Sequence, residues 1–360
     1  MAAPTVQLEP SDRSWLPAAL EVLEGGRLVV LPTETVYGVA ARADDPRALE
    51  RLRQAKGRPP GLAFTWHVAS PAALEAYPGT GACARRLAER YWPGPLTLVL
   101  PGVPAGLEEV AREGWTGLRC TAGEFSSALC EAAPFPVVMT SANAHGQAEM
   151  TEAGELAGLE LAGDDLVLEA PGVKLPGSST VLLLGGGRFE LLREGLHDLE
   201  RLRATAGLAI GFACTGNTCR SPMAEGIARA ALARRLGTSL EGVADFGFRL
   251  ESMGVMAAVG APAAEHAVAT LRERDIDISR HVARQATPEG VAELDRVYCL
   301  TESHRAALAS LLPPKRTGHL ELLDPEGRDI PDPIGGSAEV YRACAERIEA
   351  CIEARLEDWA

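Results

Sequence analysis

The chain has 360 residues, a formal net charge of −14 and 46% hydrophobic residues, so it is longer than one typical domain and apolar enough for two cores. The negative charge argues against broad affinity for nucleic acid or anionic membranes, and no direct bulk nucleic-acid binding is expected. Any anion site must therefore be built locally from clustered basic residues.

Neither a membrane span nor a secretory leader is predicted. No apolar run approaches the roughly 18 residues that cross a bilayer, and the first residues show no basic stretch followed by an apolar core. The eight cysteines are scattered along the chain, which favours free thiols over a disulfide framework. We expect a cytoplasmic protein of two domains, with no membrane partner.

The first elements follow from apolar spacing. Residues 15–24 have a helical pattern, and the apolar run that ends at residue 32 predicts a buried strand. That strand leads into P-T-E-T-V-Y-G, which places the hydroxyls of Thr33 and Thr35 at a strand end, a common place for a ligand. A helix is predicted next, at about residues 46–55.

The tetrapeptide K-G-R-P follows that helix at residues 56–59. Lys56 and Arg58 lie two residues apart on a segment restrained by proline, so both cations can converge on one polyphosphate. Taken alone, the pair also fits a solvated basic surface.

Five further segments combine an apolar or rigid stretch with polar residues. They are L-A-F-T-W-H-V-A with His67, W-P-G-P-L-T-L-V-L-P before G-L-R-C with Arg119, P-V-V-M-T-S-A-N with Ser141 and Asn143, S-S-T-V with Ser179, and L-L-R-E-G with Arg193. His67 fits either a ligand-binding role or a packed core histidine.

The order of these motifs resembles the YrdC-like threonylcarbamoyl-adenylate synthases over about residues 14–200. The resemblance implies a twisted mixed α/β sheet with a large basic concavity. It also implies that ATP, L-threonine and bicarbonate form threonylcarbamoyl-AMP and pyrophosphate there. The product would pass to the machinery that transfers the threonylcarbamoyl group to tRNA.

The same resemblance implies roles for individual residues. The nucleotide would be held by Lys56, Arg58, Ser141, Asn143 and Arg193, and threonine by Thr33, His67, Arg119 and Ser179. The chemistry agrees, because the cations can neutralise the negative charge of a triphosphate and an arginine can bind a carboxylate through two hydrogen bonds. Mg²⁺ is expected to arrive with ATP, without ligands from protein side chains.

One departure from the family keeps a second reading open. The family follows K-G-R-P with a short polar stretch and P-L, whereas this chain has P-G-L-A-F. The alternative is a sensor domain that binds a nucleotide or RNA without turning it over.

The two halves are joined by a short helical tether at residues 196–206, and we place the domains at 1–205 and 206–360. Beyond it, strands and helices alternate, which predicts a doubly wound parallel sheet with its site at the carboxyl ends of the strands. The predicted strands are 208–213, about 246–252, 296–301 and 319–323, and the predicted helices are 222–236, 263–274, 302–312 and 338–358.

The loop C-T-G-N-T-C-R-S begins at Cys214 and joins the first of these strands to the next helix. Successive backbone N–H groups and the helix start form an anion cradle, and Arg220 can grip two phosphate oxygens. The same positive field lowers the pKa of a thiol, so we expect Cys214 to be a thiolate nucleophile.

The rest of the loop shapes the cradle. Ser221 and Pro222 are expected as the N-cap and first residue of the helix, and Gly216 and Asn217 as residues that tolerate a positive φ. The loop and specificity residues are Thr215, Gly216, Asn217, Thr218, Cys219 and Ser221.

This half resembles the low-molecular-weight protein tyrosine phosphatases, and among them the protein arginine phosphatases, over about residues 207–355. Asp332, in D-P-I-G-G-S, matches the family's general acid. The implied mechanism uses Cys214 as the nucleophile, Arg220 to hold the phosphate oxygens and Asp332 to protonate the leaving group of a phosphoprotein. No metal is required.

Two residues favour phosphoarginine over phosphotyrosine. Thr218 is a small hydroxyl where tyrosine phosphatases of this family tend to carry a larger aliphatic residue, and it can accept a bond from a guanidinium. Ile334 stands where tyrosine phosphatases usually place a stacking aromatic. It also differs from the phenylalanine of the arginine enzymes, so a phosphotyrosine phosphatase stays the alternative.

Cys219 lies five residues after Cys214 and could trap the oxidised nucleophile as a reversible disulfide. A zinc half-site is the rival interpretation. Arsenate reductases share the loop but need further relay cysteines. Cys344 and Cys351 could serve, although their shared helix face is more simply explained as core.

Overall fold

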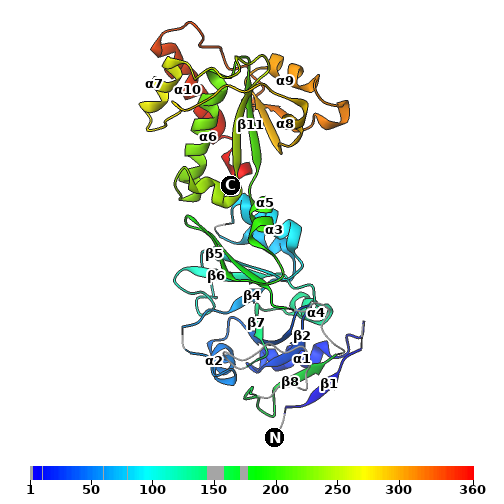
Figure 1. Cartoon of the computed structure of the whole chain (residues 1–360). Helices are drawn as coiled ribbons and strands as arrows, with labels where there is room; N and C mark the ends of the chain where they lie inside the picture. Colours follow the sequence, from blue (N-terminus) through cyan, green and yellow to red (C-terminus); the bar gives the residue numbers. More distant parts are fainter. Residues whose placement is uncertain (1–2, 10, 60, 79, 144–157, 171–176) are drawn as a thin grey trace. The chain divides into compact units, whose positions relative to one another are not determined.

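The computed structural model describes residues 3–9, 11–59, 61–78, 80–143, 158–170 and 177–360. It divides the chain into two compact units, the first with Met1–Thr80 and Ala84–Leu202 and the second with Gly81–Cys83 and Arg203–Ala360 (Figure 1). Helix α5 (Leu199–Ala206) carries the chain from one unit into the other. The domain boundary between residues 205 and 206 stays a prediction.

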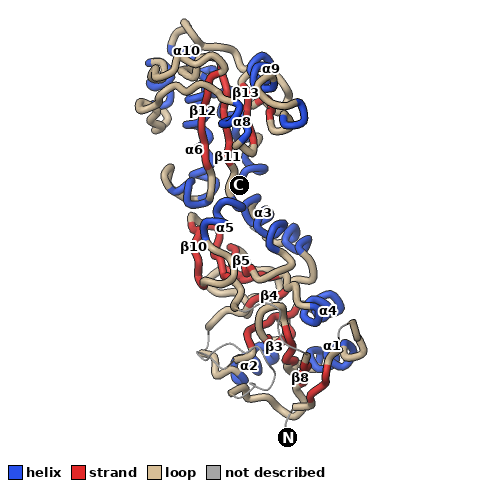
Figure 2. Tube along the Cα trace, turned by 45° about the vertical axis from the view of Figure 1, so that its right-hand side comes forward, coloured by secondary structure: helices blue, strands red, loops and turns tan. Residues whose placement is uncertain are grey.

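The first unit is built on a mixed sheet. In the described part of the chain, ten strands are hydrogen-bonded in the order β1-β8-β2-β3-β7-β4-β6-β5-β9-β10, with both parallel and antiparallel neighbours. Figure 2 shows strands of this sheet in red, among them β3, β4, β5, β8 and β10. The strands are β1 (Thr5–Gln7), β2 (Val29–Pro32), β3 (Tyr37–Arg42), β4 (Thr65–His67), β5 (Leu96–Pro101), β6 (Trp115–Arg119), β7 (Val137–Ser141), β8 (Leu166–Glu169), β9 (Thr180–Gly185) and β10 (Arg188–Arg193). Besides α5, the helices are α1 (Leu16–Glu24), α2 (Pro46–Ala55), the 3-10 helix η1 (Pro71–Ala76), α3 (Ala82–Tyr91) and α4 (Glu124–Ala132). This confirms the predicted mixed α/β fold.

Strand β2 is buried on both faces of the sheet, and its successive residues point to opposite sides. Val30 belongs to the same apolar cluster as Leu49 of α2, whereas Leu31 belongs to the cluster that contains Leu23 of α1. A strand covered on both faces needs a continuous apolar run, which is what the sequence shows there.

Strand pairing positions the polar residues of this unit. Strands β4 and β6 run parallel, with His67 opposite Arg119. Strand β7 runs antiparallel to β4, with Thr65 opposite Met139, so that Ser141 lies toward the start of β4. The polar residues therefore lie at the two ends of one stretch of sheet.

The second unit contains a four-stranded parallel sheet in the order β12-β11-β13-β14. Its strands are β11 (Ala209–Cys214), β12 (Arg249–Gly254), β13 (Arg296–Cys299) and β14 (Leu320–Leu322). Its helices are α6 (Arg220–Leu236), η3 (Gly242–Phe246), α7 (Glu265–Arg272), α8 (Pro288–Ala292), α9 (Glu302–Ala309), η4 (Pro314–Arg316), α10 (Ala338–Glu353) and α11 (Leu356–Trp359).

Helices cover both faces of this parallel sheet. Helices α6 and α10 pack together and α6 lies against β11 and β12, whereas α8 and α9 contribute Val291 and Leu308 to an apolar cluster with Val297 of β13 (Figure 1). The doubly wound parallel fold is confirmed. Among the described helices, none is long and apolar enough to cross a membrane.

The structure corrects three local expectations. Helix α6 begins at Arg220 with Cys219 as its N-cap, so Ser221 and Pro222 lie inside the helix and do not start it. Asn217 has the expected positive φ of 57°, but Gly216 does not. The predicted C-terminal helix is divided into α10 and α11.

Candidate active sites

A cavity of about 230 Å³ lies over the first unit's sheet. Its lining includes most of the residues singled out from the sequence, namely Thr33, Arg58, His67, Arg119, Ser141, Ser179 and Arg193. Lys56 is buried beside it and donates from Nζ to the backbone carbonyl of Ser141. Asn143 follows two residues after Ser141 and is half-buried. Segments far apart in the sequence thus converge on one site.

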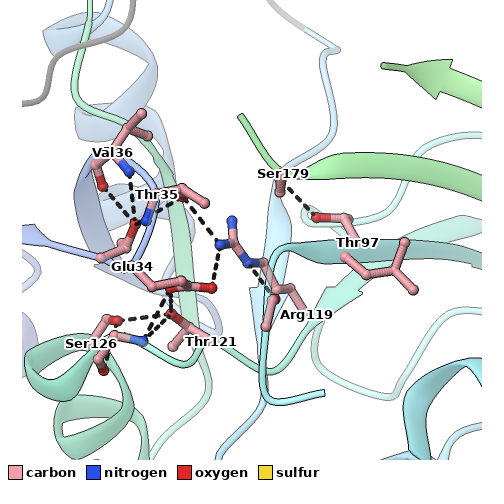
Figure 3. A network of polar contacts seen from close by, with 12 residues as sticks. Glu34, Thr35, Val36, Thr97, Arg119, Thr121, Ser126 and Ser179 are labelled. Carbon is pink, nitrogen blue, oxygen red and sulfur yellow. Dashed lines mark hydrogen bonds and ion pairs between the residues drawn. The ribbon is translucent and has the colours of Figure 1, made fainter. Parts of the chain in front are cut away.

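Arg119 is held rigidly at one end of the cavity. Its Nη2 donates to Glu34 Oε1 at 2.6 Å and to Thr35 Oγ1 at 3.2 Å, and its Nε donates to the carbonyl of Gly94 at 3.2 Å (Figure 3). No described residue bonds to the remaining nitrogen, Nη1, although the side chain is only 8% exposed. A buried guanidinium with an open donor at a cavity suits an anionic ligand group.

Glu34 is a buried member of this site that sequence reasoning missed. Its Oε2 accepts from Thr121 Oγ1 at 2.5 Å and from the N–H of Gly123 at 3.1 Å (Figure 3). Burial acts to raise the pKa of Glu34, but the Arg119 charge and the bonds from Thr121 and Arg119 together hold that pKa below its ordinary value. Glu34 is therefore a carboxylate that fixes the orientation of Arg119. The only sequence signal was its place in P-T-E-T.

Thr33 shapes the turn at this end of the cavity. Its Oγ1 donates to the carbonyl of Val36 at 2.6 Å and accepts from the backbone N–H groups of Thr35 and Val36 at 3.1 and 3.2 Å. Its hydroxyl is therefore committed within the turn, and it positions Thr35 beside Arg119.

His67 is neutral and faces the cavity. Its Nδ1 lies 3.1 Å from the carbonyl of Thr65, which can only accept, so Nδ1 carries the proton and Nε2 is left as an acceptor. Burial, with the Arg119 charge adding to it, lowers the pKa of His67 to about 3. The residue is thus both packed in the core and open to the cavity, and it can accept a hydrogen bond from a hydroxyl or an amine.

Arg193 and Ser179, assigned to different ligands from the sequence, contact each other. The Nε and Nη2 of Arg193 donate to the carbonyl of Ser179 at 3.0 and 2.9 Å, and Nη2 also reaches Ser179 Oγ at 2.7 Å. Ser179 Oγ in turn lies 3.4 Å from Thr97 Oγ1. The two expected binding regions therefore share a wall.

Arg58 is held by the stretch that departs from the family. Its Nη2 donates to the carbonyl of Ala63 at 2.7 Å, and its guanidinium lies over the ring of Phe64 at 4.8 Å. Burial, and then the nearby charge of Arg53, lower its pKa. Its buried Nε has no hydrogen-bond partner among the described residues. The altered stretch thus holds a cation with an open donor at the cavity.

A second site lies at the carboxyl end of β11, where Cys214 is 3% exposed. Its Sγ lies 2.9 Å from Ser221 Oγ. That hydroxyl accepts from Asn217 Nδ2 at 2.9 Å, so its own proton is available to the sulfur or to the carbonyl of Met253 at 3.3 Å. Ser221 therefore acts from inside α6 as a donor beside the sulfur, and not as the expected cap.

Asn217 fixes the shape of the loop. Its Oδ1 accepts from the backbone N–H of Arg284 at 2.7 Å, and its carbonyl accepts from His281 Nε2 at 2.7 Å. The side chain is fully buried, and the positive φ turns the backbone at this residue. The loop conformation is thus determined by residues that lie more than sixty positions away.

His304 supports the loop from another element and was also missed. Its Nε2 lies 2.9 Å from Thr215 Oγ1, and its Nδ1 lies 2.8 Å from Oγ1 of Thr301, the N-cap of α9. Burial, and then the Arg220 charge, lower the pKa of His304 to about 4. It is therefore a neutral ring that ties the loop to α9.

Arg220 and Asp332 meet at the mouth of this loop. They form an ion pair, and Arg220 Nη1 also donates to the carbonyl of Ile330 at 3.0 Å. The buried Nε of Arg220 has no hydrogen-bond partner within the described chain. Asp332 is 39% exposed, and its Oδ1 accepts from the N–H of Ile334 at 3.2 Å. The loop thus carries a buried cysteine at its start and an arginine at its end that is paired with the carboxylate of Asp332.

Thr218 and Cys219 complete the loop. Thr218 Oγ1 lies 3.6 Å from Cys219 Sγ, which lies 3.3 Å from the hydroxyl of Tyr341.

Burial raises the pKa of Cys344 to about 12 and also raises that of Cys351, as expected for core thiols. Within the described ranges no group of three or more His, Cys, Asp or Glu side chains could hold a metal ion.

Comparison with known families agrees with this division. The model of the family Sua5/YciO/YrdC, described as "Telomere recombination", matches residues 21–195. The model described as "Low molecular weight phosphotyrosine protein phosphatase" matches residues 209–359. The chain is a fusion of these two families. Its phosphatase part is 35% identical over 149 residues to the protein-arginine-phosphatase of Geobacillus stearothermophilus, covering 41% of the chain and 92% of that relative.

The Sua5/YciO/YrdC part of the fusion is 35% identical over 190 residues to threonylcarbamoyl-AMP synthase of Pyrococcus abyssi (strain GE5 / Orsay), covering 51% of the chain. The chain spans only 54% of the length of that relative. Another relative, from Mycobacterium leprae (strain TN), is 32% identical over 215 residues, which are 56% of the chain, and is covered to 92%. A solved structure of a P. abyssi Sua5 variant superposes with a TM-score of 0.51 at 25% identity, covering 70% of this chain and 91% of that one.

Proposed function

We propose that the first unit is an L-threonylcarbamoyladenylate synthase that converts ATP, L-threonine and bicarbonate into threonylcarbamoyl-AMP and pyrophosphate. The observation that carries this is the convergence on one cavity of open donors on Arg119 and Arg58 with the neutral acceptor of His67. The names of the synthase relatives support it. The product would pass to the tRNA threonylcarbamoyl transfer machinery.

The geometry divides the work between the two ends of the cavity. The open Nη1 of Arg119 would hold the threonine carboxylate, and His67 Nε2 would accept from its hydroxyl or amine. Because its pKa is near 3, His67 orients threonine and does not take a proton at neutral pH. Toward Ser141, the cations of Lys56 and Arg58 would hold the nucleotide phosphates.

Three further residues would complete the binding site. Arg193, which grips Ser179, would hold the nucleotide while Ser179 contacts threonine, and Asn143 would contact the nucleotide beyond Ser141. Mg²⁺ would accompany ATP and neutralise its phosphate oxygens. Removing Mg²⁺ with EDTA should therefore stop pyrophosphate release, and adding Mg²⁺ back should restore it. Unchanged release in EDTA would contradict this.

The test supplies ATP, threonine and bicarbonate to the whole chain and measures pyrophosphate and the adenylate. Wild type should form both, and Lys56→Ala should form neither, because a phosphate-binding cation is lost. Cys214→Ser is the matched control and should retain full synthase activity. Nucleotide binding without either product would instead favour the non-catalytic sensor of nucleotide or RNA.

We propose that the second unit is a cysteine-dependent protein phosphatase. The observation that carries this is the Cys214 sulfur beside Ser221 Oγ at 2.9 Å, with Arg220 and Asp332 paired at the mouth of the same loop. The sulfur would form a bond to phosphorus while the bond to the leaving group breaks, and Asp332, separated from Arg220 and protonated from solvent, would give that proton to the leaving group. Water would then hydrolyse the phosphocysteine, passing its proton to Asp332.

Arg220 has a donor ready for this chemistry. Its open Nε can bind a phosphate oxygen before the pair with Asp332 separates, and its Nη2 can then follow. Separation of the pair frees Asp332 to reach the leaving group. Cys214→Ser should abolish phosphatase turnover, and Lys56→Ala should leave it intact. If either change removed both activities, the two sites would not be independent.

We propose that phosphoarginine is the preferred phosphorylated residue, supported by Thr218 in the loop and by the names of two phosphatase relatives. A hydroxyl at this position accepts a bond from the guanidinium of the leaving group. Thr218→Ile should shift the kcat/KM ratio toward phosphotyrosine by about tenfold, the factor for about 1.4 kcal/mol. A wild type that prefers phosphotyrosine, or a ratio unmoved by the change, would favour the phosphotyrosine alternative.

A further inference from the structure

An uncharged, apolar loop lies beside the phosphatase site. Residues 254–264, G-V-M-A-A-V-G-A-P-A-A, contain no charged or polar side chain in a protein in which 23% of residues are charged. Met256 and Val259 are 76% and 72% exposed. Exposed loops usually carry polar side chains, and grouped exposed apolar residues mark a binding surface.

The backbone of this loop is tied to the phosphate-binding loop. The N–H groups of Val255, Met256, Ala258 and Ala264 donate to the carbonyls of Cys214, Thr215, Gly216 and Thr218 at 2.9, 2.9, 3.3 and 2.8 Å. The apolar loop therefore runs directly alongside the phosphate-binding loop, with Met256 and Val259 exposed on it.

Other exposed apolar residues border the same site. Ile334 is 71% exposed and lies two residues after Asp332, which pairs with Arg220. Val282 is 56% exposed and precedes Ala283, whose backbone pairs with that of residues 260 and 261 of the apolar loop. We call Met256, Val259, Val282 and Ile334 the apolar rim.

We propose that the apolar rim binds apolar side chains that flank the phosphorylated residue of a protein substrate. This rests on the proposed phosphatase activity. Because Cys214 is 3% exposed, the phosphorylated side chain must reach down into the loop, and its neighbours in the substrate then lie over the rim. An extended segment with aliphatic residues on both sides of the phosphorylated one fits this surface, whereas charged neighbours would lose solvation against it.

The test compares two phosphopeptides and the free phosphoamino acid, made with phosphoarginine or phosphotyrosine, whichever wild type turns over faster. The peptides differ only in their flanking residues, which are leucine and valine in one and glutamate and lysine in the other. Wild type should favour the apolar peptide by about tenfold in kcat/KM. Met256→Glu and Val259→Glu should each lower the ratio of apolar-peptide to free-phosphoamino-acid kcat/KM by about tenfold.

Leu311→Glu is the matched control, because Leu311 is a 38% exposed leucine of the same unit that belongs to neither loop. Leu311→Glu should leave kcat/KM unchanged for both the apolar peptide and the free phosphoamino acid. Equal use of the two peptides, or a ratio lowered no further by Met256→Glu than by Leu311→Glu, would overturn the rim while leaving the phosphatase proposal intact. A change of oligomeric state in Met256→Glu with an unchanged ratio would likewise overturn it. No turnover of any substrate would instead overturn the phosphatase proposal.

Discussion

Replacing Glu34 by glutamine should destabilise the first unit strongly. Glutamine keeps the shape but removes the negative charge and half of the acceptor capacity. Arg119 would then be a buried cation without its counter-charge, and the amide NH2 would face either Arg119 or both donors, Thr121 and Gly123, that share Oε2. Breaking a buried ion pair by removing one partner costs about 3 to 5 kcal/mol. Because the amide oxygen still accepts the bonds on one of these two sides, we expect a loss of about 3 kcal/mol, at the lower end of this range.

Glu190→Gln provides the matched control. Glu190 pairs with Arg188 at 2.7 Å, but the two side chains are 54% and 47% exposed. A pair in contact with water contributes roughly 0 to 1 kcal/mol, so this variant should unfold nearly as wild type does. The comparison therefore separates the effect of burial from that of losing a Glu–Arg pair.

Urea unfolding followed by tryptophan fluorescence reports mainly on the first unit, which holds four of the chain's five tryptophans: Trp15, Trp66, Trp92 and Trp115. The pKa of Glu34 is lowered in the folded chain, so its contribution is full above the ordinary value of 4.5 and is lost as pH falls through the folded pKa. The penalty of Glu34→Gln should therefore shrink in acid. A loss no larger than that of Glu190→Gln at neutral pH would refute the argument.

Three other outcomes follow from the sites. The pKa of His67 falls from 6.5 to about 3 on folding, so between these pH values the unfolded chain binds one more proton than the folded chain, and stability drops as pH falls. His67→Gln should therefore remove a slope of about 1.4 kcal/mol per pH unit from the urea-unfolding free energy in this range. An unchanged slope would contradict this. Asp332→Asn should lower kcat on the order of 100-fold or more for a poor leaving group and less for a good one, and equal losses would remove Asp332 from the acid role. Mild peroxide should inactivate the phosphatase, and a thiol reductant should then restore its activity. In Cys219→Ser the reductant should restore no activity. Equal recovery of activity in the variant and wild type would exclude Cys219 as the resolving thiol.

The sequence by itself determined the fold class and most of the chemistry-bearing residues. Buried strands show as continuous apolar runs, and the phosphate-binding loop is formed by neighbours in the chain, so both can be predicted locally. The residues predicted to bind ligands in the first unit were identified from the order of its motifs, and most of them line the cavity. Short elements escaped this reasoning: α8 has five residues, too few to show a helical period.

The tertiary structure alone decided which side chains become partners. Glu34 and Arg119 are 85 residues apart, and Thr215 and His304 are 89 apart. Such pairs depend on which strands become neighbours and in what register, as when β4 and β6 place His67 opposite Arg119. Spacing along the chain does not show which strands become neighbours. The free-energy cost of burying a charged or polar side chain is offset by a hydrogen-bond partner, and only the folded core determines which residue that partner is.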